Sequence, residues 1–297
     1  MKKVFNVAQS LFLYVLLISM SVVFLYPFLY MFVMSFQSYS DVISATVKWI
    51  PREFSPGNWN IAFKSLNYVQ SFGNSFMVAA LATIGHVLSG ALVGYGFARY
   101  KFPFSGALFM IVLFTIIVPV KTLIVPEYML YSKISFVGTH LPMVVPAYLG
   151  MGIKGGMFIF LYRQYFLNLP KELEEAAYID GCGHLRTFVQ IAFPSAASTT
   201  LVCTVLSIVW HWHDYFEPSI YLSSQKKMLL PQMLPQMYSF LETLTNATTE
   251  QAVELKMIFH EGVVMAGTAL ATIPLLIMYF ILQRRFIQGI ERTGLVE

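Results

Sequence analysis

SLFLYVLLISMSVVFLYPFLYMFVMSF, residues 10–36, decides the class of this fold. It lies within a longer stretch, from Val4 to Ser40, that contains no charged side chain. A helix rises 1.5 Å per residue, so roughly 20 apolar residues cross the ~30 Å hydrocarbon core of a bilayer. A secretory signal peptide after Lys2 and Lys3 would have an apolar core of only ~7–15 residues. The segment is therefore predicted to be a retained first membrane span.

The composition of the chain also indicates a membrane protein. Of the 297 residues, 57% are hydrophobic and 11% are charged, whereas soluble domains carry roughly 25% charged residues. The net charge is +4, and no block of Lys and Arg marks a nucleic-acid surface, so nucleic acid is excluded as a partner. Cys182 and Cys203 lack the spacing of a disulfide framework.

Six apolar segments are long enough to be spans. They are residues 10–36, 73–98, 104–124, 141–166, 195–221 and 262–284. Backbone groups in hydrocarbon must be satisfied within the segment, and the alternating pattern of a membrane barrel is absent. We therefore predict an all-α membrane protein with six transmembrane helices in a single domain, residues 1–297.

The basic residues predict the orientation of these helices. Ten of the 19 Lys and Arg residues fall in the short segments on the side of the N-terminus. The loops on the other side, residues 37–72, 125–140 and 222–261, are longer and carry fewer. Basic residues concentrate in short cytoplasmic segments, so both termini are predicted to be cytoplasmic.

The loop of residues 167–194, between the fourth and fifth spans, predicts a short helix. It contains the run Asn168-Leu-Pro-Lys-Glu-Leu-Glu-Glu-Ala-Ala-Tyr-Ile-Asp-Gly181. Pro170 suits a helix N-terminus, the acids that follow suit its positive end, and Gly181 suits the stop. Ala176 and Ala177 are small enough for another surface to approach closely. An ordinary amphipathic connector is the alternative.

This loop resembles the EAA motif of binding-protein-dependent ABC importer permeases. The match comprises Glu175-Ala176-Ala177, Gly181 after three further residues, and Ile191-Ala-Phe-Pro194 after nine more. The wider string from Leu169 to Pro194 is similar to the carbohydrate-uptake branch, which contains the maltose-type permeases. Phe193 stands where the family usually has Leu.

The resemblance covers nearly the whole chain. It includes Phe72-Gly-Asn-Ser75, Tyr95-Gly-Phe-Ala-Arg99 and Gln283-Arg284-Arg285-Phe286. Trp212-His213-Asp214 is similar to the family's Trp-Asn-Asp stretch, with His213 in place of Asn.

The resemblance implies a prokaryotic cytoplasmic-membrane protein that works with several partners. These are a second related permease subunit, two ATPase subunits that hold ATP and Mg, and an external sugar-binding protein. The loop helix would dock into an ATPase subunit. The residues implied in this coupling are Glu175, Ala176, Ala177, Asp180, Gly181, Ile191 and Pro194. The external loop 222–261 would contact the sugar-binding protein, and a surface-lying helix hairpin is the alternative.

No chemistry of its own is visible in this chain. The Gly-x4-Gly-Lys-[Ser/Thr] phosphate loop is missing, so nucleotide binding by that route is excluded and energy must come from a partner. His211 and His213 have no third ligand beside them, so no metal is predicted. An intramembrane enzyme would need convergent catalytic groups. A stand-alone ion-coupled transporter would show inverted repeats. Neither feature is visible.

Polar residues inside the spans are candidates for a solute pathway, because ionisable groups are unfavourable in hydrocarbon. Lys154 lies among glycines of the fourth span and either lines the path or snorkels from a broken helix. In the fifth span, Ser207, Trp210, Asp214 and Glu217 follow a helical spacing. One helix face would then offer an aromatic ring and hydrogen-bonding groups to a sugar. In the alternative, the tryptophans form an interfacial belt and the acids lie outside the membrane.

Overall fold

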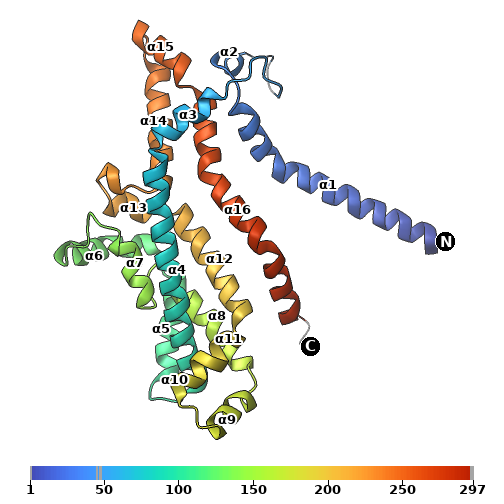
Figure 1. Cartoon of the computed structure of the whole chain (residues 1–297), viewed down its shortest axis with the longest axis vertical. Coiled ribbons are helices and arrows are strands. Elements are labelled where there is room, and N and C mark those ends of the chain that lie inside the picture. Colours follow the sequence, from blue (N-terminus) through green and yellow to red (C-terminus); the bar gives the residue numbers. More distant parts are fainter. Residues whose placement is uncertain (1, 45, 47–48, 295–297) are drawn as a thin grey trace. The chain divides into compact units, whose positions relative to one another are not determined.

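Helices make up all the regular structure in the residues that the computed structural model describes, 2–44, 46 and 49–294. Within these residues no β-strand forms, and Gln37 and Phe54 make only an isolated bridge. The predicted all-α fold is therefore confirmed (Figure 1). The chain divides into two units, Met1–Tyr68 with Met233–Pro274, and Val69–Gln232 with Leu275–Glu297.

The first unit begins with the long apolar helix α1 (Lys2–Met34). The other members of this unit are α2 (Tyr39–Val42), α3 (Gly57–Ser65), most of α14 (Leu230–Asn246), α15 (Glu250–Ile258) and the first part of α16 (Glu261–Gly294). From Leu11 to Tyr30 the apolar side chains of α1 are exposed within the chain, as expected for a helix that faces lipid or another protein. Asn58 in α3 donates hydrogen bonds of 3.0 and 2.8 Å to the carbonyls of Ser35 and Gln37, just after α1.

Helices α14 and α15 form a hairpin within residues 222–261. The rings of Phe240 and Phe259 are in edge contact, with centroids 4.9 Å apart. The Lys256 ammonium donates hydrogen bonds to the carbonyls of Thr245 and Ala247, at the end of α14. Residues 222–261 therefore contain a helix hairpin, and its contact with a sugar-binding protein stays a prediction.

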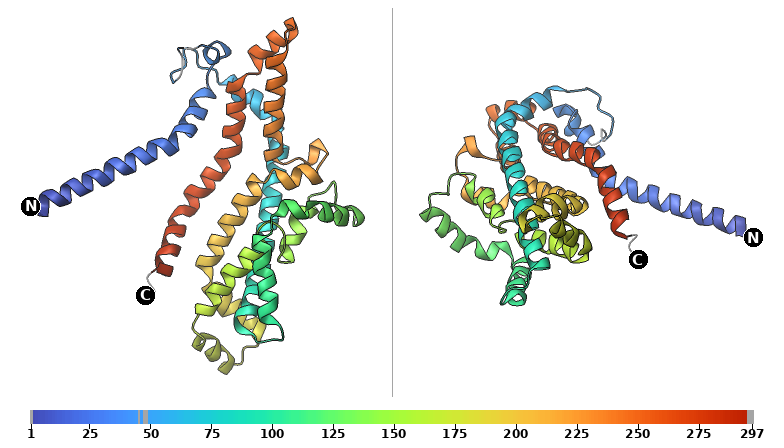
Figure 2. Two further views of the ribbon diagram at one scale, coloured as in Figure 1. Left: turned by 180° about the vertical axis from the view of Figure 1, so that it is seen from behind. Right: turned by 60° about the horizontal axis from the view of Figure 1, so that its bottom comes forward.

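The second unit is built on helix α4 (Tyr68–Arg99), which packs closely against α8 (Gly155–Asn168). A Cβ atom at Gly94 would lie 2.8 Å from the Cβ of Tyr162, so only glycine permits this approach. Figure 2 shows α4, α8 and α12 (Ala197–His213) side by side. Their shared core contains Phe158, Tyr162 and Cys203, all fully buried.

The third predicted span, 104–124, is broken. Helix α5 (Ser105–Ile117) ends before Pro119, and α6 (Val120–Lys133) continues at an angle of 106°. Val118 is extended, as expected of the residue before a proline. Segment 125–140, predicted to be an external loop, therefore begins inside a helix.

The fourth predicted span, 141–166, is also broken, between α7 (Leu141–Tyr148) and α8. Gly150 and Gly152 have φ values of +72° and +81°, and Lys154 has +57°. A left-handed backbone at three positions cannot continue a right-handed helix, so a single helix here is wrong.

The fifth predicted span, 195–221, is divided into α12 and α13 (Phe216–Tyr221), because Asp214 is extended. By length and composition, three described helices can each cross a membrane alone: Gln9–Met34, Tyr68–Arg99 and Glu261–Gln283. If each of two bent helix pairs is one span, the number in the described chain rises to five. A total of six crossings, which would require segment 141–166 to cross as well, stays a prediction.

Candidate functional site

Helix α9 (Glu172–Ile179) is the short helix predicted in the loop of residues 167–194. Gly181 follows it with a φ of +81°. The Gly181 N–H donates a 3.1 Å hydrogen bond to the Tyr178 carbonyl, and the Cys182 N–H donates one of 2.9 Å to the Ala177 carbonyl. This pair of bonds is the Schellman motif, which needs a residue that tolerates positive φ. The predicted helix stop at Gly181 is confirmed.

Two faces of α9 have different environments. Glu174 and Ala177, one turn apart, are buried within the chain, with 6% and 4% exposure. Glu175, Ala176 and Asp180 are exposed. Of the two small residues, Ala177 therefore packs inside this chain, and Ala176 lies on the open face together with Glu175.

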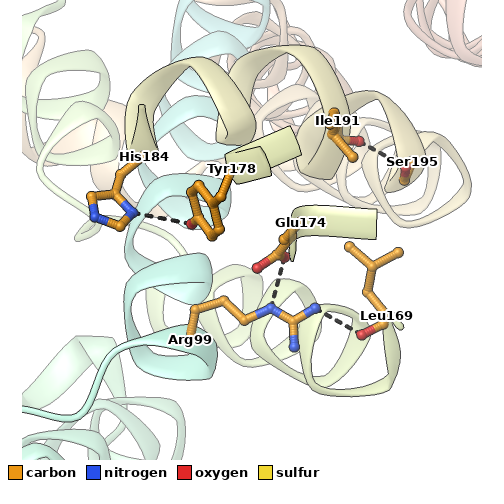
Figure 3. A network of polar contacts seen from close by, with 7 residues as sticks. All are labelled: Arg99, Leu169, Glu174, Tyr178, His184, Ile191 and Ser195. Carbon is orange, nitrogen blue, oxygen red and sulfur yellow. Dashed lines mark hydrogen bonds and ion pairs between the residues drawn. The ribbon is translucent and has the colours of Figure 1, made fainter. Parts of the chain in front are cut away.

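A buried ion pair joins α9 to the end of α4 (Figure 3). The Arg99 Nε donates to the Glu174 carboxylate at 2.8 Å, and the two side chains are only 6% and 8% exposed. A second guanidinium nitrogen donates to the Leu169 carbonyl at 2.7 Å. Removal of one partner from a buried pair leaves an uncompensated charge, which costs about 3–5 kcal/mol. We name Arg99, Glu174 and Leu169 the clamp.

Aromatic side chains beside the clamp link α9 to α10 (His184–Thr187) and to the residue after α4. The Tyr178 hydroxyl lies 3.0 Å from His184 Nδ1, as Figure 3 shows. The His184 ring is in edge contact with Tyr100, at 5.6 Å between centroids. Burial raises the pKa of Tyr100, and Tyr178 raises it further, so this phenol stays neutral at physiological pH.

The chain then passes into α12 through a run of short helices. We name residues 172–195, from the start of α9 to the end of α11, the elbow. Helix α10 leads into the π-helix η1 (Phe188–Ala192) and α11 (Phe193–Ser195), and α12 leaves at 75°. Ile191 is half-buried, and its carbonyl accepts a 2.7 Å hydrogen bond from the Ser195 hydroxyl. Pro194 is exposed at the bend. An apolar groove of about 300 Å³ lies along α11 and the first half of α12. Its lining residues are Phe193, Pro194, Ala197, Thr200, Leu201 and Thr204.

Two predicted pathway residues of α12 pack against other helices of the second unit, Ser207 fully buried and Trp210 half-buried. Ser207 is fully buried and accepts a 2.9 Å hydrogen bond from the Thr83 hydroxyl of α4. Trp210 packs against Phe158 of α8, with ring centroids 5.6 Å apart. Both therefore contribute to packing among α4, α8 and α12.

The other three predicted pathway residues lie where helices end. Lys154 is exposed just before α8, outside any helix, as in the broken-helix alternative. Asp214 follows α12, and its carboxylate accepts hydrogen bonds from the N–H groups of Phe216 and Glu217 at 3.0 and 3.4 Å. Glu217 is 8% exposed on α13. The predicted single stripe on one helix is wrong, because the chain turns at Asp214 to cap α13.

Comparison with known proteins assigns the chain to a family. Residues 86–292 match the binding-protein-dependent transport system inner membrane component family. The chain belongs to this family. It is a permease component, as its EAA-like loop indicated.

Relatives of this permease include proteins named for sugar transport. It is 28% identical over 273 residues to a probable starch degradation products transport system permease protein, AmyC, of Thermoanaerobacterium thermosulfurigenes, covering 92% of each chain. It is 28% identical over 267 residues to the lactose transport system permease protein LacG of Rhizobium radiobacter, covering 89% of each.

A solved structure has the same fold as this permease. It belongs to a bacterial ABC transporter that imports the acidic polysaccharide alginate. The TM-score is 0.78 at 18% identity, over 96% of this chain and 97% of that one.

The clamp is the part of this permease that the sequence analysis missed. In the sequence, Arg99 is only the last residue of the family-like string that begins at Tyr95, and Glu174 is one of three acids in the first turn of α9. One signal was available. Glu174 lies three residues before Ala177 and shares its helix face, and that face is the one the chain buries.

Proposed function

We propose that this permease is one membrane subunit of an ATP-driven sugar importer, and that α9 transmits closure of an ATPase subunit to the spans. The observation that carries the coupling role is the clamp, because it holds α9 rigidly against α4 while leaving the opposite face of α9 open. The names of relatives support sugars as the solutes.

The open face of the elbow has the character of a docking surface. Ile179, Leu185 and Val189 are exposed by 86%, 73% and 60%, and Glu175 lies close by in α9. Apolar side chains with a neighbouring carboxylate suit a protein partner, which would bury the former and pair the latter. In this proposal Gly181, Asp180, Ile191 and Pro194 keep the elbow in shape. Glu175 and Ala176 make the contact.

The remaining partners follow from the same proposal. A second related permease completes the pathway, two ATPase subunits hold ATP and Mg, and an external sugar-binding protein delivers the solute. The elbow and both termini face the cytoplasm, and the α14–α15 hairpin faces the sugar-binding protein. Alternating access opens the pathway outward when the ATPase subunits close.

Reconstitution of the complete complex tests this function. ATP turnover and vesicle uptake are measured with maltotriose, lactose and arabinotriose, and with an amino acid and inorganic phosphate as comparison solutes. We expect uptake of at least one sugar, strictly dependent on ATP. Uptake without ATP would instead indicate an ion-coupled transporter. A response only to the amino acid or phosphate would favour a permease for another small polar solute.

A further inference from the structure

Helix α6 and the segment from Asp214 through α13 bring three tyrosines and three carboxylates together within the second unit. The Tyr221 ring is parallel to that of Tyr128, with centroids 6.4 Å apart, and meets the Tyr131 ring edge-on at 5.4 Å. The Tyr221 carbonyl accepts a 2.8 Å hydrogen bond from the Gly138 N–H, which fixes α13 beside the segment after α6. We name the group the tyrosine–carboxylate cluster; its members are Glu127, Tyr128, Tyr131, Asp214, Glu217 and Tyr221.

Two helix breaks create this cluster. Helix α6 leaves α5 at 106° after Val118, and α13 begins after the turn at Asp214. At membrane depth, non-helical backbone is tolerated where it is buried in protein or lines a water-filled cavity, and transporters place binding sites at such breaks. Both breaks therefore mark this cluster as a position where a solute could be held.

The cluster contains buried polar atoms that lack partners. The Tyr221 hydroxyl belongs to a side chain with 1% exposure; it faces the Glu127 carboxylate and has no other hydrogen-bond partner among the described residues. One Asp214 carboxylate oxygen is likewise buried without a partner. Buried polar groups in native proteins are nearly always hydrogen-bonded, so each exception needs an explanation. A ligand with several hydroxyls would satisfy both atoms.

The charge of the cluster is not compensated. Glu217 interacts electrostatically with Asp214 and Glu127, and none of the three forms an ion pair with a described residue. Lys121 is nearby, but its ammonium lies over the Phe216 ring, 5.2 Å from the centroid. Carboxylates accept hydrogen bonds from hydroxyls and repel other anions. No described group of three or more His, Cys, Asp or Glu residues could hold a metal ion.

We propose that the tyrosine–carboxylate cluster is a solute subsite that binds hydroxyl-rich sugars and rejects acidic ones. Tyr128, 41% exposed, offers a flat apolar face to a sugar ring. Glu127, Glu217 and the Tyr221 hydroxyl bind the sugar hydroxyls, and the negative charge excludes uronic acids. This assignment rests on the proposed function and adds a solute class to it.

Direct binding to the purified permease–ATPase complex tests the subsite. The sugar-binding protein is left out, so that any bound sugar is held by the membrane subunits. Equilibrium dialysis is done with maltotriose, lactose and arabinotriose, and with trigalacturonate as the acidic probe. Tyr221→Phe removes the hydroxyl and keeps the ring, and Glu127→Gln with Glu217→Gln removes two charges at constant shape. The matched controls are Tyr238→Phe and Glu53→Gln, at exposed positions outside the cluster.

We expect wild-type complex to bind a neutral probe and not trigalacturonate. Tyr221→Phe should raise the Kd for the neutral probe about three- to tenfold, because the sugar loses one hydrogen bond. The double Gln variant should bind trigalacturonate within about tenfold of the neutral probe, and both controls should match wild type. Equal wild-type affinity for trigalacturonate, or a Kd unchanged in both cluster variants, would overturn the subsite. So would the absence of saturable binding of every probe.

The uptake assay separates this outcome from failure of the proposed function. ATP-dependent sugar uptake by a complex whose cluster variants bind like wild type overturns the subsite alone. Absence of uptake of every sugar overturns the proposed function, and the subsite assignment with it.

Discussion

The elbow and the tyrosine–carboxylate cluster both bury carboxylates in the second unit, but they treat the charge in opposite ways. At the elbow, Glu174 has a guanidinium at 2.8 Å, and that guanidinium also reaches a backbone carbonyl. In the cluster, Glu217 has other carboxylates as its charged neighbours. A paired charge holds a structure in place, whereas an unpaired one lowers stability unless something else binds it. We infer that the paired charge keeps the elbow rigid, and that the unpaired carboxylates of the cluster are there to bind a solute.

The largest expected effect comes from breaking the clamp. Arg99→Ala leaves Glu174 buried and unpaired, so stability should fall by about 3–5 kcal/mol. The thermal midpoint of the purified complex measures this change. The double variant Arg99→Ala with Glu174→Ala removes both charges and should recover a large part of the loss. If both variants lose the same stability, the charge pair does not explain the role of Arg99.

A smaller effect is expected at the helix stop. Apart from its two chain neighbours, no described residue has an atom within 4 Å of a Cβ placed on Gly181, so a side chain there meets no clash. The φ of +81° still strains any β-branched residue, by about 1–3 kcal/mol. Gly181→Val should therefore distort the elbow and reduce sugar uptake per ATP hydrolysed, while the complex still assembles. Gly183→Val is the matched control, since Gly183 has an ordinary φ of −79° and equally open surroundings. Equal coupling in both variants would contradict the assignment.

The stop at Gly181 was predictable, whereas the clamp was not, for a physical reason. A capped short helix depends on residues close in sequence, and these are visible as Pro170, the acids and Gly181. Arg99 and Glu174 are 75 positions apart, so their contact depends on how α4 and the loop pack. Local pattern carries no information about that packing.

The helix breaks were hidden for a different reason. Hydropathy reports whether a segment prefers lipid, and residues 141–166 and 195–221 do. It does not report backbone direction, which changes at Gly150, Gly152 and Asp214. The glycines of the fourth span did indicate a broken helix as an alternative. Asp214 itself is ambiguous, because an Asp can equally continue a helix or cap the next one. The available signal was Pro218, since a proline ring clashes with the carbonyl four residues earlier, here that of Asp214.

A third experiment tests the cluster through the sign of its effect on stability. Glu217→Gln keeps the shape and removes a buried charge that has no cationic partner, so the thermal midpoint should rise, by the equivalent of about 1 kcal/mol. Glu174→Gln, the same substitution at the clamp, should lower it because Arg99 loses its partner. A fall in both variants would remove the contrast between the two regions. A rise in the thermal midpoint for Glu217→Gln alone would establish the contrast between the two regions, even if the solute is unknown.

The smallest effect on stability, and the most specific one on function, is expected on the open face of α9. Glu175 is exposed and has no ion-pair partner in the described part of the chain, so Glu175→Gln should change stability by less than about 0.5 kcal/mol. It should nevertheless lower sugar-stimulated ATP turnover, because the proposed ATPase partner loses a charged contact. Glu172→Gln, an exposed acid in the same turn, is the control. Its turnover should stay near wild type, since the family-like spacing starts at Glu175. Equal losses of turnover at both positions would mean that the partner responds to general negative charge at the N-terminus of α9 and not to Glu175 itself. A loss at Glu175 alone would locate the partner on the face opposite the clamp.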